Sequence, residues 1–221
     1  MKKSLIIFDL DGTILNTLDD LRNSVNFSLA KHGFPLRSLE QIRLAIGNGV
    51  AMLVKRSLPI NVDNETYKNV LYDFEKHYAL HNSDLTKAYD GMLETLIELK
   101  NKGYKLAVST NKIENVAQEL VNKIYPNIFE MVAGDNNKRQ KKPAPDSIFD
   151  IIQNLDISNK REVIYIGDTE VDYQTAKNAG IECILVSYGY RTVNELTEMN
   201  LDIKKIIHSP KYLVKIMLAN N

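Results

Sequence analysis

From about residue 92 onward, short apolar runs rich in β-forming residues alternate with segments of helical periodicity. This alternation restricts the possible folds more than any other feature of the chain. Including one run near the N-terminus, the apolar runs cover 5–8, 105–109, 129–133, 163–167 and 183–187. The helical patterns cover 91–103, 113–124, 146–155 and 170–180. Strands that alternate with helices predict a parallel sheet with helices packed on its faces.

Residues 17–86 interrupt the alternation. They carry helical patterns and no convincing strand. The economical interpretation is a helical insert placed after the first strand and folded as a lid. We therefore expect two domains, with residues 1–16 and 87–221 forming the α/β core and residues 17–86 forming the helical insert.

Polar side chains follow most of the predicted strands. Ligands of parallel α/β sheets bind beyond the carboxyl ends of the strands, so these residues are candidates for one site. Chance would scatter such residues to both ends of the sheet. The polar strand ends are Asp9 and Asp11, Thr110 and Asn111, Gly134 and Asp135, and Asp168 and Asp172.

The acidic strand ends suit a hard cation. Asp9, Asp11 and Asp168 offer carboxylate oxygens, and Asp172 lies one helical turn beyond Asp168. Carboxylates with few imidazoles favour Mg²⁺. None of the four histidines lies near these strand ends in the sequence, which disfavours zinc. We expect Asp9, Asp11 and Asp168 to bind Mg²⁺, with Asp172 behind them.

Hydrogen-bond donors near such a cation would make a site for a tetrahedral anion. Thr110 and Asn111 supply a hydroxyl and an amide, and Lys142 supplies an ammonium from the segment KKPAPD. Gly12 and Thr13 allow a sharp bend, so their backbone N–H groups can also point at the anion. The expected ligand is a phosphate group bound by Gly12, Thr110, Asn111 and Lys142.

Two carboxylates two residues apart can divide the work of phosphate hydrolysis. One, bound to Mg²⁺, can attack phosphorus, while the other protonates the leaving oxygen and then takes a proton from water. Each motif also has a simpler interpretation. An Asp-x-Asp pair often forms a turn, Thr-Asn often follows a strand as a turn, and KKPAPD can be an exposed loop.

Composition excludes several classes of protein. Lys plus Arg and Asp plus Glu are each 28, which argues against broad contact with nucleic acid. No apolar stretch approaches the ~20 residues of a membrane helix, and Asp9 interrupts the short N-terminal run that resembles a signal peptide. Cys183 is the single cysteine, so no internal disulfide can form and a cytoplasmic location is expected.

Together these residues resemble the haloacid dehalogenase superfamily of aspartate-nucleophile phosphatases. DLDGT is similar to the first motif, with Asp9 as nucleophile and Asp11 as acid/base. Thr110, Lys142, and Asp168 with Asp172 are similar to the second, third and fourth motifs. The resemblance implies a Rossmann-like core, a small helical cap, Mg²⁺ dependence and an aspartyl-phosphate intermediate. The loop 134–147 departs from the family in its longer lead-in to Lys142.

Within the superfamily, residues 45–58 look like the cap segment of phosphoglycolate phosphatases. The turn IGNGV precedes a helix, and we expect Asn48 to bind the non-phosphate end of the substrate, with Arg43, Lys55 or Arg56 as charge partners. Related pyrophosphatases, sugar-phosphate phosphatases and phosphomutases share these motifs. A phosphate-binding receiver domain is an alternative from another class. The expected partner is a small phosphorylated metabolite, with no nucleic acid or membrane, and the chain a monomer or homodimer.

Overall fold

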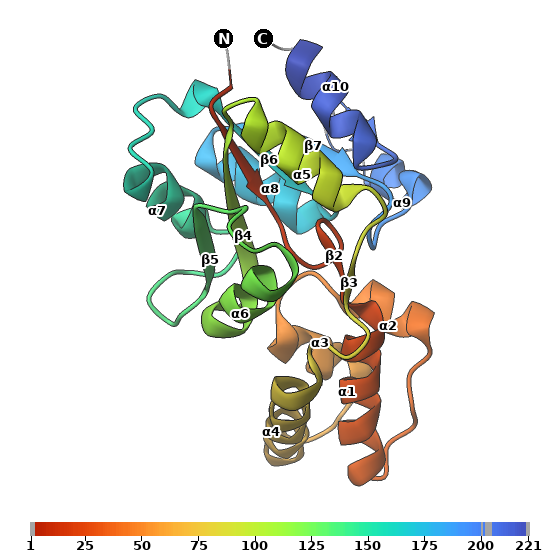
Figure 1. The fold of residues 1–221 in the computed structure, drawn as a ribbon. Coiled ribbons are helices and arrows are strands. Elements are labelled where there is room, and N and C mark those ends of the chain that lie inside the picture. Colours follow the sequence, from red (N-terminus) through yellow and green to blue (C-terminus); the bar gives the residue numbers. More distant parts are fainter. Residues whose placement is uncertain (1–2, 200, 202–204, 220–221) are drawn as a thin grey trace. The chain divides into compact units, whose positions relative to one another are not determined.

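A parallel sheet forms the centre of the larger part of the chain. The computed structural model describes residues 3–199, 201 and 205–219, and within them six strands pair in the order β5-β4-β1-β6-β7-β8 (Figure 1). Every pairing between neighbours in this sheet is parallel. The strands are β1 (Leu5–Phe8), β4 (Lys105–Ile113), β5 (Met131–Asp135), β6 (Val163–Gly167), β7 (Glu182–Val186) and β8 (Ile206–Ile207).

The sheet is buried on both faces, as the unbroken apolar run of β1 predicts. Ile6 and Phe8 belong to a core cluster that includes side chains of α5, α6 and α10. Leu5 and Ile7 point the other way, into a cluster with α7 and α8. The helices named here are α5 (Met92–Asn101), α6 (Glu114–Ile124), α7 (Asp146–Asn154), α8 (Glu170–Ala179) and α10 (Lys211–Ala219), and α9 (Val193–Glu198) lies between α8 and α10 in the sequence.

The structure confirms the predicted fold class, a parallel α/β sheet with a helical segment inserted after the first strand. β1 and β6 have the predicted bounds, and Gly180 adopts the left-handed conformation at the end of α8. The sequence analysis missed the elements after residue 187, namely α9, β8 and α10. It also ended β4 too early, because Thr110 to Ile113 continue that strand.

The helical insert is compact in its own right. The chain divides into two units, Met1–Leu15 with Ala88–Asn221, and Asn16–Lys87. The second unit has its own apolar cluster, to which all four of its helices contribute. The helices are α1 (Leu18–Lys31), α2 (Leu39–Ala45), α3 (Val50–Ser57) and α4 (Asn64–His81). The strands β2 (Leu15–Asn16) and β3 (Lys87–Ala88) pair where the chain enters and leaves this unit.

The buried Asp20 near the start of the helical unit forms hydrogen bonds with residues near its end. The Asp20 side chain in α1 accepts hydrogen bonds from the backbone N–H groups of Leu85 and Thr86 and from the Thr86 hydroxyl, at 2.7–3.1 Å. Asp20 is only 2% exposed. Its buried carboxylate therefore serves as acceptor for two part-buried backbone N–H groups. Across the residues that the structure describes, no helix has both the length and the hydropathy to cross a bilayer.

We expect Asp20→Ala to lower the free energy of unfolding by about 1–3 kcal/mol, because two part-buried N–H groups lose their acceptor. Urea denaturation followed by circular dichroism measures the loss. Asp19 is the matched control, since its side chain is 45% exposed and its carboxylate lies 3.3 Å from Arg22. Asp19→Ala should change the free energy of unfolding by less than about 0.5 kcal/mol. Equal losses in the two variants would contradict the anchoring role of Asp20.

Candidate active site

Three aspartates converge at the carboxyl end of the central strands. Phe8 of β1 pairs in register with Ile166 of β6, so the residues that follow the two strands are neighbours. The Asp9 N–H donates to the Ile166 carbonyl oxygen at 2.8 Å. Asp9, Asp168 and Asp172 each place a carboxylate oxygen within 4.8 Å of the others. All three side chains are buried.

Asp168 is held by groups from two other loops. Its Oδ1 accepts from the Thr13 hydroxyl at 2.9 Å, and its Oδ2 accepts from the Tyr190 N–H at 2.7 Å. Gly12 and Gly189 allow this approach, since a Cβ on either residue would overlap the Asp168 side chain. Burial raises the pKa of Asp168 well above its ordinary value, and the nearby Asp172 and Asp9 add to the rise.

Asp172 closes the first turn of α8 and orients the site. Its Oδ2 accepts from the N–H groups of Asp168 and Thr169 and from the Thr169 hydroxyl, at 2.8–3.2 Å. Its Oδ1 accepts from the Lys142 ammonium at 2.7 Å and lies 3.3 Å from the Tyr165 hydroxyl oxygen. Both oxygens are thus engaged by the protein, and Asp172 places Lys142.

Lys142 supplies positive charge among these acids. Its Nζ donates to the Tyr165 hydroxyl at 3.0 Å, in addition to Asp172, and lies 2.8 Å from Asp9 Oδ1. The Tyr165 hydroxyl donates in turn to the Ser109 carbonyl at 2.9 Å. Burial alone would lower the pKa of Lys142, but attraction by Asp172 and Asp9 outweighs burial, so the pKa lies well above its ordinary value.

Asp9 has an incompletely satisfied oxygen. The contact of Oδ1 with Lys142 is an ion pair without hydrogen-bond geometry, and Oδ1 is a buried atom with no hydrogen-bond donor among the described residues. The pKa of Asp9 is raised to about 7, because burial outweighs the lowering effect of Lys142 and the negative charge of Asp172 adds to the rise. A buried carboxylate in this state is stabilised by any cation that can reach it.

Asp11 lies apart from the three clustered aspartates. Lys112 Nζ lies 2.9 Å from Asp11 Oδ1 and 3.3 Å from Oδ2, and donates to both. The sequence analysis predicted Asp9, Asp11 and Asp168 as metal ligands. The structure gathers Asp9, Asp168 and Asp172 and directs the Asp11 carboxylate to Lys112.

The predicted phosphate-binding donors lie near the same strand ends. Thr110 is buried, and its hydroxyl accepts from the Lys112 N–H at 3.2 Å. The Asn111 side chain exchanges two hydrogen bonds with the Lys142 backbone, at 2.8 and 3.1 Å. Asn111 thereby fixes the segment that carries Lys142.

The tight turn after β1 uses its own backbone donors. The Gly12 N–H donates to the Leu15 carbonyl at 2.8 Å, and the Thr13 N–H donates to the Leu10 carbonyl at 3.3 Å. The sequence analysis expected both N–H groups to face an anion. In the structure they close the turn, because the backbone of residues 10–15 folds back on itself.

In the helical unit, Asn48 lies beside an arginine. Its Oδ1 accepts from Arg56 Nη2 at 2.7 Å, and Arg56 Nη1 donates to the Ala45 carbonyl at 2.9 Å. The Arg43 guanidinium is instead paired with Glu40 through two contacts of 2.7 and 2.8 Å. Lys55 is exposed, while Leu53 and Leu58 are buried, as the helical spacing predicts.

Comparison with known proteins now identifies the family. The family model described as "Haloacid dehalogenase-like hydrolase" matches residues 6–186, which include every aspartate of the site. The chain belongs to this family. The predicted resemblance is therefore confirmed, and the protein is an enzyme of the hydrolase class.

Several relatives of this haloacid dehalogenase-like hydrolase are named phosphoglycolate phosphatase. A phosphoglycolate phosphatase of Pseudomonas syringae pv. syringae is 33% identical over 214 residues, which cover 92% of this chain and 78% of that protein. A phosphoglycolate phosphatase of Aliivibrio fischeri is 30% identical over 220 residues, 96% of each chain. A solved structure from Lactobacillus delbrueckii subsp. bulgaricus superposes with a TM-score of 0.91 at 30% identity, covering 98% of this chain and 99% of that one.

Four residues of this haloacid dehalogenase-like hydrolase were missed in the sequence analysis. They are Lys112, which contacts Asp11, Tyr165, which contacts Lys142, and Gly189 and Tyr190, which contact Asp168. Lys112 follows Thr110 and Asn111 directly, so its position at a polar strand end was a signal. The segment SYGYR after the last predicted strand offered a weaker one.

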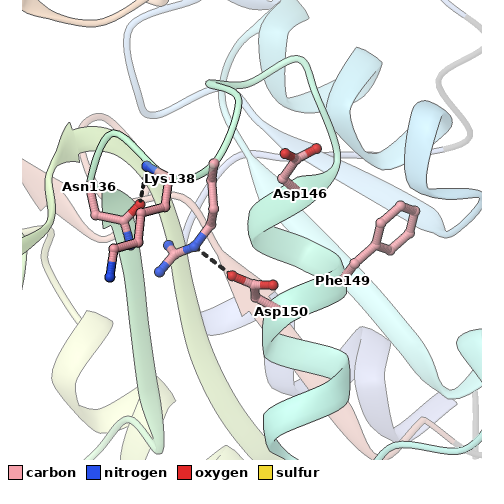
Figure 2. Close-up of a pocket in the computed structure, with 6 residues that line it drawn as sticks. Asn136, Lys138, Asp146, Phe149 and Asp150 are labelled. Carbon is pink, nitrogen blue, oxygen red and sulfur yellow. Dashed lines mark hydrogen bonds and ion pairs between the residues drawn. The ribbon is translucent and has the colours of Figure 1, made fainter.

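The long loop before Lys142 forms a separate pocket with α7. Figure 2 shows Asn136 and Lys138 on the loop side and Asp146, Phe149 and Asp150 on the helix. The Arg139 side chain also lines this cavity of about 490 Å³ and is paired with Asp150 at 2.6 Å. Among the described residues that line the pocket, none belongs to the aspartate cluster.

We expect Gly189→Ala to destabilise this hydrolase by about 1–3 kcal/mol, because the new methyl group would overlap the Gly12 carbonyl and the Asp168 side chain. The sign is informative, since Gly→Ala at a permissive position usually stabilises by about 0.4–1 kcal/mol. Thermal and urea denaturation measure the change. Ser187→Ala in the same loop serves as control, because it removes only an exposed contact of 2.7 Å with His208, and should shift stability by about 0.5 kcal/mol. Stabilisation by Gly189→Ala would contradict the close approach.

Proposed function

We propose that the enzyme is a Mg²⁺-dependent phosphatase that hydrolyses small phosphate monoesters through an aspartyl-phosphate on Asp9. One observation carries the proposal. The Asp9 carboxylate is buried between acids and Lys142, yet its Oδ1 accepts no hydrogen bond within the described residues. A carboxylate oxygen that the protein holds by an ion pair alone is available to attack phosphorus.

The acids of the site fit a magnesium ion. Asp9, Asp11, Asp168 and Asp172 outnumber Lys112 and Lys142, so the site has an excess of negative charge. Burial is the main cause of the raised pKa values of Asp9 and Asp168, and the neighbouring acids add to the rise. Asp9 and Asp168 would hold the ion through hard oxygen atoms, which Mg²⁺ prefers. When bound, the ion would neutralise charge on the phosphate and lower the repulsion between it and the Asp9 carboxylate.

The remaining residues divide the chemistry. Asp9 attacks phosphorus and the bond from phosphorus to the ester oxygen breaks, while Asp11 gives that oxygen a proton. Asp11 then takes a proton from the water that attacks the aspartyl-phosphate, which releases phosphate and restores both carboxyl groups. Lys142 and the Thr110 hydroxyl would stabilise the charge on the transferred group. Asn111 and Asp172 hold Lys142 in place.

The substrate we favour is 2-phosphoglycolate or a closely similar phosphorylated acid. The names of the relatives support this class. The Arg56 guanidinium, held against Asn48 and the Ala45 carbonyl, is suited to a carboxylate because its position is fixed before a ligand binds. We propose that the helical unit is a cap that binds the carboxylate of the substrate. We also propose that the enzyme is cytoplasmic.

Treatment with EDTA should abolish hydrolysis of p-nitrophenyl phosphate, and added Mg²⁺ should restore it. Asp9→Asn should stay folded and lose at least about 10³-fold in kcat, because an amide is a poor nucleophile. Rapid-quench mass spectrometry should find a phosphoryl group on Asp9 in the wild type. Asp84→Asn, at an exposed position of the helical unit, controls for loss of a carboxylate. Full activity of the EDTA-treated enzyme would end the metal-dependent assignment.

The wild type should prefer 2-phosphoglycolate to ethyl phosphate by about tenfold or more in kcat/KM, because a charged hydrogen bond contributes ~1.5–3 kcal/mol. Asn48→Ala and Arg56→Met should both reduce this ratio and leave p-nitrophenyl phosphate hydrolysis nearly unchanged. Arg43→Met is the matched control, since Glu40 already neutralises that guanidinium. Equal kcat/KM for the two esters in the wild type would leave a general small-molecule phosphatase.

A further inference from the structure

An irregularity in β4 aims Lys112 at the active site. Ser109 pairs with Ala133 and Ile113 pairs with Asp135, so β4 has two more residues than β5 over the same step. Such bulges re-aim side chains beside active sites. Gly134 accommodates the extra chain, because a Cβ there would overlap the Lys112 carbonyl oxygen and the backbone of Glu114.

The result is a buried ion pair outside the three clustered aspartates. The Lys112 side chain is 3% exposed and that of Asp11 is 18% exposed. A buried ammonium is costly unless it is paired, so Lys112 strongly favours its contact with Asp11. Because Nζ donates to both carboxylate oxygens, the contact fixes the rotation of the carboxylate as well as its place.

Without Lys112, the Asp11 carboxylate would be a fourth acid close to Asp9 and Asp168, and a bound divalent cation would attract it. A carboxylate engaged as a ligand has an oxygen on the cation, where it cannot serve the leaving group. We propose that Lys112 is a positioning residue that keeps the Asp11 carboxylate out of the cation's ligand set. The inference rests on the proposed Mg²⁺-dependent function and concerns only the orientation of Asp11.

A double-mutant cycle on Mg²⁺ binding tests this role. Isothermal titration calorimetry on EDTA-treated, dialysed protein gives Mg²⁺ affinity for wild type, Lys112→Met, Asp11→Asn and the double variant. Lys112→Met should bind Mg²⁺ roughly tenfold more tightly than wild type, and the gain should vanish in the Asp11→Asn background. Lys112→Arg, which keeps the charge and the donors, should bind like wild type.

Lys3→Met is the matched control for loss of a buried lysine. Lys3 is also mostly buried and donates to the Arg161 and Val163 carbonyls, and it lies at the amino end of β1. Its loss should leave Mg²⁺ affinity unchanged. Lys112→Gln replaces Lys112→Met in the cycle if the methionine variant does not fold, and carries the same expectation.

Two results would overturn the inference. One is a gain in affinity that is equally large with and without the Asp11→Asn substitution, which would mean that Lys112 acts through its charge alone. The other is unchanged or weaker Mg²⁺ binding by Lys112→Met, or by Lys112→Gln where it takes the place of the methionine variant. If the wild type hydrolyses phosphate esters with Mg²⁺ in either case, the proposed function survives and only the positioning role fails. A wild type that neither binds Mg²⁺ nor hydrolyses esters would remove the proposed function itself.

Discussion

The attraction between the Lys142 ammonium and two buried carboxylates is the interaction on which the rest of the site depends. Asp9 and Asp172 are buried at the carboxyl end of the sheet, where desolvation opposes their charge. The Lys142 Nζ lies within 2.8 Å of both carboxylates, and their negative charge raises the pKa of Lys142 well above its ordinary value. Asn111, Tyr165 and the first turn of α8 are arranged around this lysine. Removing the ammonium would leave buried acids facing each other without compensation.

Close backbone approach is the second requirement, and glycines provide it. A Cβ on Gly167 would overlap the Asp172 side chain, and one on Gly189 would overlap the Gly12 carbonyl and Asp168. The acids can therefore lie within 4.8 Å of one another because the backbone of glycines in β6 and in two loops packs directly against them. Gly12, at φ +88°, also permits the turn that places the Thr13 hydroxyl on Asp168. Dense packing and charge compensation thus depend on the same few residues.

These two requirements explain what the sequence could and could not predict. Apolar runs and helical spacing indicated the sheet, because burial on both faces leaves a continuous signal, as in β1 and β6. Asp9 and Asp168 were predicted because polar residues at the strand ends of a parallel sheet meet, and Lys142 because it lies in the loop beyond such a strand. Lys112 was missed because its aim depends on a two-residue mismatch between β4 and β5, which residue spacing within one strand does not reveal. The Tyr190 contact was missed for a similar reason, since a backbone N–H leaves no residue pattern.

Substitutions in the two units are expected to differ in their effect on stability, and this difference affects how substrate specificity can change. The residues that are proposed to act on phosphate are packed through clusters of the sheet and its helices. Asn48 and Arg56 belong to a unit with a separate apolar cluster built from α1 to α4. A substitution at Arg56 removes an exposed guanidinium and two local hydrogen bonds, whereas a change near Lys142 disturbs several buried charges at once. The proposed recognition of the non-phosphate end of a substrate can therefore vary at less cost to stability than the buried charges of the acid cluster.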